Sequence, residues 1–332
     1  MKHLFYLLLL TSHFSLLTAR AQYAPQAGAN GTTAIAASSS QIVSWATHCT
    51  VKRGYLDIAQ ASLGYVSSGD SSLALGAVDN FVVSLGDSGV ATLTFANPIV
   101  NGNGYDFAVF ENGFYNPSNS EEAFLELAFV EVSSDGINFF RFPASSLTQT
   151  TSQLSSVTGQ NYMNARWVNN LAGKYVSNYG TPFDLQELSG IAGLNINHIT
   201  HVRIVDVVGS IGEHASYDTA GNKINDPYPT NFPIGGFDLD AVGVIHQSAT
   251  NNINPIDRQL VLIYPNPAND YLTVKTEEVL NVSLMDVTGK LLKQFRVIGQ
   301  QTIPLSELQS GMYLLNFVNS KGVRWTERIT KL

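Results

Sequence analysis

Short strand-like segments dominate the chain from about residue 40 to residue 246. They are rich in Val, Ile, Phe and Thr, and clusters of Gly, Asn, Asp and Pro separate them. The clearest are VATLTFA (90–96), YDFAVF (105–110), FLELAFVEVSSDGINFFRF (124–142), HVRIVDVV (201–208) and GGFDLDAVGVI (235–245). Within the third, SSDG predicts a hairpin turn with Gly136 at positive φ, whereas PFDLQELSG (182–190) predicts one short helix. The pattern therefore predicts an all-β fold, a β-sandwich or jelly roll.

The first residues have the pattern of an export signal. A basic start precedes an apolar run over 4–17, and small residues follow at Ala19 and Ala21. That run is shorter than the roughly 20 residues that span a bilayer, and the small residues predict a signal peptide over 1–21. No later segment is apolar enough to cross a membrane, and Cys49 alone forms no disulfide framework. We therefore expect a soluble, exported protein.

Charge is divided unevenly along the chain. Residues 22–257 contain 7 Lys and Arg against 20 Asp and Glu, a balance of −13, whereas residues 258–332 contain 9 against 6, a balance of +3. Such an acidic main body repels phosphate backbones, which argues against nucleic acid as a partner. It is compatible with bound cations, and equally with a surface that only keeps an exported protein soluble.

The change in charge coincides with a change in pattern. ATNNINPID (249–257) has no apolar periodicity and contains a proline, which predicts a linker over 249–259. The chain is thereby predicted to hold a β-sandwich body over 22–248 and a small β-sandwich over 260–332, in which DVTGK forms a hairpin turn around Gly289.

The C-terminal segment carries a recognisable set of motifs. They are YPNPANDYLTV (264–274), VSLMDVTGKLLKQ (282–294), LSELQSGMYLLNF (305–317) and the ending Lys331-Leu332. In this order and spacing they resemble the type A C-terminal sorting domain of the type IX secretion system of Bacteroidota. The resemblance implies export to the periplasm, passage across the outer membrane by the type IX machinery, and removal of the domain. The protein would then be attached to the outer cell surface or released.

The body is also similar to a known group. VEVSSDGINFFRFP (130–143) and the closing segment GGFDLDAVGVI resemble the strand–turn–strand and last strand of discoidin-like, galactose-binding-type jelly rolls. This resemblance implies a fold and an extracellular location, but no particular ligand.

Acidic residues on strands that are otherwise apolar are the candidates for metal binding. If 237–245 alternates regularly, Asp238 and Asp240 share a face with Val242 and Val244, where unpartnered carboxylates are costly. Glu111 and Asn112 stand where a strand runs into a Gly-rich loop, and Asp206 lies on the apolar face of 201–208.

First and last strands of jelly rolls lie near one another, so these groups could converge on a structural Ca²⁺, which prefers such oxygen ligands. The alternative is that loop N–H groups satisfy each acid.

Aromatic residues in Asn/Gly-rich stretches are the candidates for ligand contact. The predicted set is Tyr115, Trp167, Tyr175, Tyr179 and Tyr217, with Tyr228 as a further candidate. Such rings suit sugar faces, although in a loop-rich sandwich they can equally pin loops to the core. We expect the loops 160–182 and 213–232 to form one rim, with 110–118 nearby.

Enzymatic motifs are weak in this sequence. WATHC (45–49) and GDSG (86–89) resemble serine-protease signatures, but only 39 residues separate His48 from Ser88, too few for the two barrels that such a triad needs.

We therefore expect a non-enzymatic surface module that binds a glycan or another extracellular ligand. The alternatives are an adhesin-like structural component without a small ligand, and a glycan hydrolase using Glu111 with Glu126 or Asp238.

Overall fold

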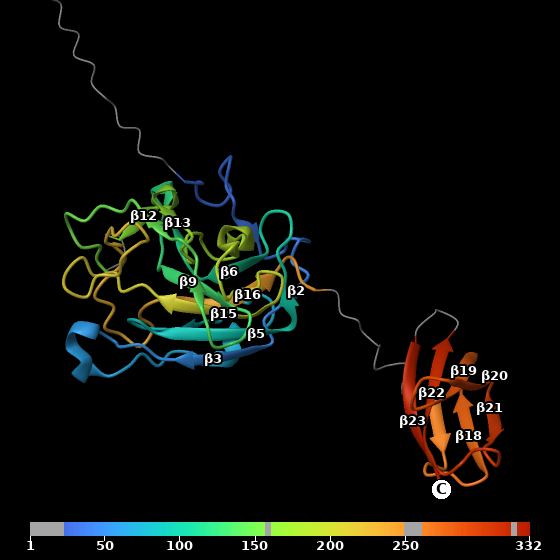
Figure 1. The fold of residues 1–332 in the computed structure, drawn as a ribbon. Helices are drawn as coiled ribbons and strands as arrows, with labels where there is room; N and C mark the ends of the chain where they lie inside the picture. Colours follow the sequence, from blue (N-terminus) through green and yellow to red (C-terminus); the bar gives the residue numbers. More distant parts are fainter. Residues whose placement is uncertain (1–22, 157–160, 249–260, 320–323) are drawn as a thin grey trace, which may run out of the picture. The chain divides into compact units, whose positions relative to one another are not determined.

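The computed structural model describes residues 23–156, 161–248, 261–319 and 324–332. The chain divides into two compact units, Met1–Ala249 and Thr250–Leu332. Regular structure in both is almost entirely β, which confirms the predicted all-β fold (Figure 1). The predicted signal peptide (1–21) and linker (249–259) lie outside the described residues.

The body is built mainly from two antiparallel sheets. One has the order β1 (Ile35–Ala36), β14 (Tyr179–Phe183), β6 (Phe107–Glu111), β16 (Asp238–Val244), β2 (Ser44–Trp45), and β4 (Val83–Ser84) also pairs with β16. The other has the order β10 (Phe140–Arg141), β9 (Ala128–Ser133), β15 (Ile199–Asp206), β5 (Val90–Ile99), β3 (His48–Lys52). Figure 1 shows β9, β15, β5 and β3 side by side.

Both sheets contribute to one hydrophobic core. Val109 and Val242 of the first sheet belong to the same buried cluster as Leu93 and Ile204 of the second. Phe107 is fully buried in this cluster and stacks on Phe183 with ring centroids 5.3 Å apart. Two sheets that share a core in this way form a β-sandwich, which is compatible with the jelly-roll resemblance.

Smaller elements complete the body. They are the two-stranded sheet β11 (Ser145–Ser146) with β13 (Val168–Asn169), the three-stranded sheet β12 (Tyr162–Asn164), β8 (Asn119–Phe124), β7 (Phe114–Asn116), and the 3-10 helices η1 (Ile58–Leu63), η2 (Ser71–Ala74), η3 (Ala165–Trp167) and η4 (Leu185–Leu188). The helix predicted at 182–190 is η4, capped by Asp184. No helix among the described residues is long and apolar enough to cross a membrane.

Strand β16 departs from the regular alternation that the sequence predicted. The register of its pairing with β6 shifts between Leu239 and Ala241, as at a β-bulge. As a result Phe237, Leu239 and Val242 all belong to the sandwich core, whereas Ala241 packs in a separate cluster on the other face. The prediction that Asp238 and Asp240 share a face with Val242 was therefore wrong, because one extra residue in a strand inverts the faces that follow it.

The C-terminal unit is a second, smaller sandwich. Its sheets have the orders β17 (Val261–Tyr264), β18 (Tyr271–Thr276), β21 (Gln300–Pro304) and β20 (Leu291–Val297), β19 (Leu280–Asp286), β22 (Gly311–Asn319), β23 (Arg324–Lys331). Leu272 of the first sheet and Phe317 and Trp325 of the second lie in one buried cluster. Gly289 has φ +85° in the turn between β19 and β20, as the DVTGK motif predicted.

Candidate ligand-binding pocket

The end of β6 and the start of β16 meet at one edge of the first sheet. Glu111, the last residue of β6, lies opposite Leu239. Asn112 follows directly, and its Nδ2 donates to Oδ2 of Asp238 at 3.0 Å. The Ser84 hydroxyl of β4 donates to the other oxygen of Asp238 at 2.5 Å. Antiparallel pairing thus brings three of the predicted metal-binding positions together.

A pocket of about 250 Å³ opens beside this edge. Its lining residues, which we call the acidic pocket, are Asn112, Phe114, Phe124, Glu126, Ser156, Phe232, Ile234 and Asp238. Phe114 is 43% exposed, and its ring stacks on Phe124 with centroids 5.0 Å apart. The pocket therefore combines carboxyl groups with an accessible aromatic wall, a common composition for small-ligand sites.

Glu126 is the most unusual residue of the acidic pocket. It lies between β8 and β9 and is only 5% exposed, yet no hydrogen bond from another described residue reaches its carboxyl group. Burial raises its pKa well above the usual range, and the nearby charges of Asp238, Glu111 and Asp226 raise it further. A buried carboxyl without a partner is costly, and a ligand donor in the pocket would remove that cost.

Glu111 lies behind the pocket and is fully shielded from solvent. Its Oε2 accepts from the backbone N–H of Gly113 at 2.7 Å, whereas its Oε1 has no hydrogen-bond partner among the described residues. Burial and the charge of Asp238 raise its pKa well above the usual value. A Cβ at Gly113 would lie 2.7 Å from the carbonyl oxygen of Phe124 and 2.9 Å from Oε2 of Glu111, so only glycine allows this turn.

Asp238 is held by neutral donors rather than by a salt bridge. Burial raises its pKa to about 6, although the Ser84 and Asn112 hydrogen bonds and the charge of Arg53 oppose that shift. The Arg53 guanidinium donates to the carbonyl oxygens of Ser68, Ser84 and Gly69. Its donors are thus engaged by the backbone, and it supplies Asp238 with a nearby charge but no hydrogen bond.

The two other predicted metal ligands have different partners. Asp206 accepts from the backbone N–H of Phe237 at 2.7 Å and of Ser88 at 3.0 Å. Asp240 accepts from the N–H groups of Asp79 and Asn80 at 3.3 and 3.1 Å. Both contacts follow the alternative in which loop amides satisfy the acids. Within the described residues, no group of three or more His, Cys, Asp or Glu side chains is arranged to hold a metal ion.

Structural calcium therefore stays a prediction, and thermal melting tests it. An ion that binds only the folded body at a hundredfold excess over Kd stabilises it by about 2.7 kcal/mol. With Glu111 and Asp238 as ligands, chelation lowers the melting temperature of the wild type by several degrees and that of Asp238→Ala or Glu111→Ala much less. Equal melting temperatures with and without chelator would favour the hydrogen-bonded alternative.

The predicted aromatic set is dispersed over the body. Tyr175 is buried in the core, where its hydroxyl contacts Thr33 Oγ1 at 2.7 Å, and this placement argues against the predicted ligand contact. Tyr179 packs half-buried against the same core cluster, and Trp167 is half-buried in η3. Tyr217 is 51% exposed.

Tyr115 lines a separate cavity of about 420 Å³ beside Arg166. The hydroxyl of Tyr228 donates to Asp57 at 2.8 Å. None of these six rings lines the acidic pocket.

The pocket residues that sequence reasoning missed stand next to residues that it found. Phe114 lies three positions after Glu111 and two after Asn112. Phe232 and Ile234 lie five and three positions before the FDLD stretch. They come from two of the loops expected to form a rim, 110–118 and 213–232, together with the neighbouring 233–236. The sequence signal that could have identified these pocket residues was their position close to a candidate acidic residue.

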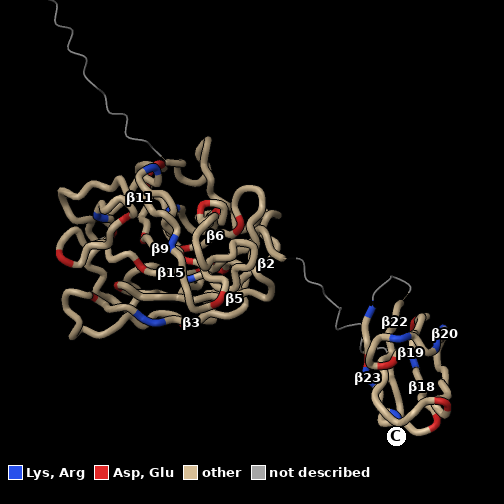
Figure 2. Tube along the Cα trace, viewed as in Figure 1, with Lys and Arg blue, Asp and Glu red and all other residues tan. Residues whose placement is uncertain are grey.

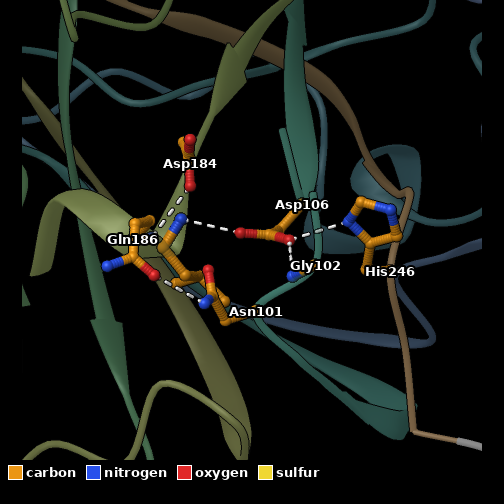
Figure 3. Close-up of polar contacts among 7 residues, drawn as sticks. Asn101, Gly102, Asp106, Asp184, Gln186 and His246 are labelled. Carbon is orange, nitrogen blue, oxygen red and sulfur yellow. Dashed lines mark hydrogen bonds and ion pairs between the residues drawn. The ribbon is translucent and has the colours of Figure 1, made fainter. Parts of the chain in front are cut away.

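A second polar centre involves a histidine that the sequence analysis did not consider. Figure 3 shows Asp106 between Gly102 and the ring of His246: Oδ1 accepts from the Gly102 N–H at 2.7 Å and lies 2.8 Å from Nδ1 of His246. Its Oδ2 accepts from the N–H of Leu185 at 2.7 Å. Asp106 thus joins the 101–106 loop, η4 and the segment after β16. No hydroxyl or thiol of the described residues hydrogen-bonds to this ring.

Residues 262–331 match the family described as secretion system C-terminal sorting domain. The match confirms the sorting domain predicted from the motifs in 260–332. The domain implies interaction with the type IX secretion machinery, export, and a surface or extracellular location. A search of curated proteins found no match.

Comparison with solved structures gave several low-scoring likenesses. CopC from Methylosinus trichosporium OB3b is 16% identical, covering 21% of this chain and 90% of that chain, with a TM-score of 0.17. Dimeric latent PorU from Porphyromonas gingivalis is 13% identical over 77% of this chain and 19% of that chain (TM-score 0.19). A β-glucuronidase from Parabacteroides merdae is 11% identical over 75% of this chain and 28% of that chain (TM-score 0.20). This chain thus spans a small part of the last two, and TM-scores this low carry no argument.

Proposed function

We propose that the body is an exported binding module that captures an extracellular glycan in the acidic pocket and does not turn it over. After type IX export and removal of the sorting domain, the module acts at the outer surface or in the medium. The observation that carries the proposal is Glu126, a buried carboxyl that accepts no hydrogen bond from the described part of the chain and lines a pocket beside the exposed ring of Phe114.

The composition of the pocket supports a sugar-sized ligand. Sugars present an apolar ring face and a polar edge, and the stacked pair Phe114–Phe124 faces the same pocket as Glu126 and Asp238. A cavity of about 250 Å³ suits one sugar unit of a longer chain better than a large ligand. Its opening onto solvent leaves room for the rest of the chain.

A glycan array with the purified protein tests this proposal. Wild-type protein should bind a defined subset of glycans, and Phe114→Ala should weaken that binding about tenfold or more, because an aromatic stacking contact is lost. Tyr217→Ala serves as the matched control, since it also removes a half-exposed ring but outside the pocket. Binding that Tyr217→Ala weakens and Phe114→Ala spares would move the site to the predicted aromatic rim.

A glycan hydrolase is the second candidate, favoured by one observation. Glu126 and Asp238 line the same pocket, and burial raises the pKa of both, as in the acid of many glycosidases. Incubating the array ligands with the protein and separating the products by chromatography distinguishes the two functions. Unchanged glycans support the binding module, whereas cleavage that Glu126→Gln abolishes would replace it with an enzyme.

A further inference from the structure

Carboxyl groups are concentrated in and around the acidic pocket. Glu126 and Asp238 line it, and the charges of Glu111, Asp206 and Asp226 act on Glu126 from behind. The cation that acts on Asp238 is Arg53, whose guanidinium donors are engaged by backbone carbonyls. Like charges at such proximity repel one another, so a ligand that brings positive charge is favoured over a neutral one.

Several oxygens in this cluster have no donor. Glu111 Oε1 and Asp226 Oδ1 are buried without a hydrogen-bond partner among the described residues, and no described residue donates a hydrogen bond to the Glu126 carboxyl. Protonation offsets the cost of burying Glu111 and Asp226, which do not line the pocket, whereas a donor that enters the pocket can reach Glu126. A charged N–H donor does more than a neutral hydroxyl, because it offsets both the missing hydrogen bond and the repulsion.

The aromatic wall distinguishes an organic cation from a metal ion. Phe114, Phe124 and Phe232 present apolar surface to the cavity, which a bare metal ion leaves unused. An ammonium group on an apolar frame uses both sides of the pocket, its charge against the carboxylates and its carbon atoms against the rings.

We propose that the acidic pocket recognises a protonated amine, that of an amino sugar within the captured glycan. The ammonium group lies against Glu126 and Asp238, and the sugar ring packs on Phe114. The proposal rests on the proposed function and names the ligand class of that same site.

Binding of an ammonium group is expected to depend on pH. Asp238, whose pKa burial raises to about 6, binds a cation fully only when ionised, so affinity rises from pH 5 as Asp238 ionises. It falls again above roughly pH 7, because the neighbouring oxygens of an amino sugar lower the pKa of its amine to near neutral and the amine then loses its charge. The other groups that face Asp238 and Glu126 are the acids Glu111, Asp206 and Asp226 and the cation Arg53. The further acids delay the ionisation of Asp238 and Glu126, and Arg53 promotes the ionisation of Asp238. Neither effect reverses the rise in affinity that follows ionisation.

Two oligosaccharides of equal length test the proposal: a chitosan tetramer, which carries free amines, and its fully N-acetylated counterpart. Calorimetric titration of the purified protein at pH 6.5, where Asp238 and the amine are both substantially charged, should show about tenfold tighter binding of the amine form, the order expected for a charge-assisted hydrogen bond. Glu126→Gln should bring the two affinities together, since glutamine keeps the shape and removes the charge. Glu213→Gln, an exposed acid outside the pocket, should leave the ratio unchanged.

The other possible outcomes distinguish failure of the amine inference from failure of the proposed function. Equal affinities for the two tetramers in the wild type would overturn the amine inference and leave glycan capture standing. A protein that binds neither tetramer nor any arrayed glycan would overturn the proposed function as well. Binding of a lysine peptide but not of the chitosan tetramer, lost in Glu126→Gln, would replace the sugar with a protein ligand. Should Glu126→Gln lower the melting temperature, Asp238→Asn makes the same comparison, and an unchanged ratio there would contradict the proposal.

Discussion

Truncation of the C-terminal unit before residue 262 should abolish surface delivery almost completely, leaving the body in the periplasm. The reason is that residues 262–331 match the sorting domain and form a compact sandwich with its own core. Deletion of Lys331 and Leu332 alone should also reduce surface delivery. Those residues tie the chain end to Ala268, to which Leu332 donates through its N–H at 2.8 Å.

Cell fractionation followed by mass spectrometry measures this effect. The wild type should appear on the surface or in the medium without the sorting domain, cleaved near 249–259, and the truncated chains in the periplasm. Lys275→Ala, which removes an exposed basic side chain from β18, is the control and should be delivered normally. Recovery of an intact Leu332 on mature surface protein would contradict the processing expected here.

The body should be more stable at pH 5 than at pH 7.5, the reverse of what carboxylates in salt bridges produce. Burial raises the pKa of Asp87, Asp238 and Asp240 to about 6. In the unfolded chain these groups titrate near 3.9. Between those values the folded body keeps protons that the unfolded chain releases, so the free energy of unfolding falls as the pH rises.

The size of this effect follows from the shift. About two pKa units correspond to roughly 3 kcal/mol per group at most, of which about half remains at pH 5 and almost none at pH 7.5. We therefore expect a melting temperature several degrees higher at pH 5 than at pH 7.5, by calorimetry of the purified protein. Asp238→Asn should flatten the profile, because a neutral amide replaces the titrating group. A melting temperature that rises from pH 5 to pH 7.5 would show that these carboxyls are ionised in the folded body.

The sequence was most informative where local pattern decides the structure. Strand β9 lies within its predicted segment, and β5, β6 and β15 overlap theirs to within three residues at either end, since short apolar runs between turn residues favour strands. Gly136 has φ +75° in the predicted hairpin turn. Asp206 is buried level with Ile204, as its position on the apolar face indicated. The sequence analysis also anticipated that Glu111, Asn112 and Asp238 could lie close together, because it expected strands distant in the sequence to be neighbours in a jelly roll.

Features that depend on non-local geometry were not predictable. A single bulge in β16 reversed the face of Asp238 relative to Val242, and no residue pattern marks it. Whether a loop ring faces solvent or core depends on the path of the loop, and close backbone approaches set that path. At Gly173, for example, a Cβ would lie 1.8 Å from the carbonyl oxygen of Glu126. Tyr175, two residues later, is buried in the core.

The charge distribution along the sequence indicated that the body is acidic, but it did not show where the acidic side chains lie. Figure 2 shows Asp and Glu spread through the body, several of them among β6, β9 and β15, whereas Lys and Arg are more frequent in the small unit. The net balance of −13 in residues 22–257 could not show that some acids are buried together. That information comes from the pairing of β6 with β16 and from the segment between β8 and β9.

A crystal structure of the protein grown with an array-selected glycan and with calcium would test the central claim most directly. The account predicts ligand density in the acidic pocket, packed on Phe114 and within hydrogen-bonding distance of Glu126. Density for the glycan elsewhere, with Glu126 still lacking a partner, would contradict it.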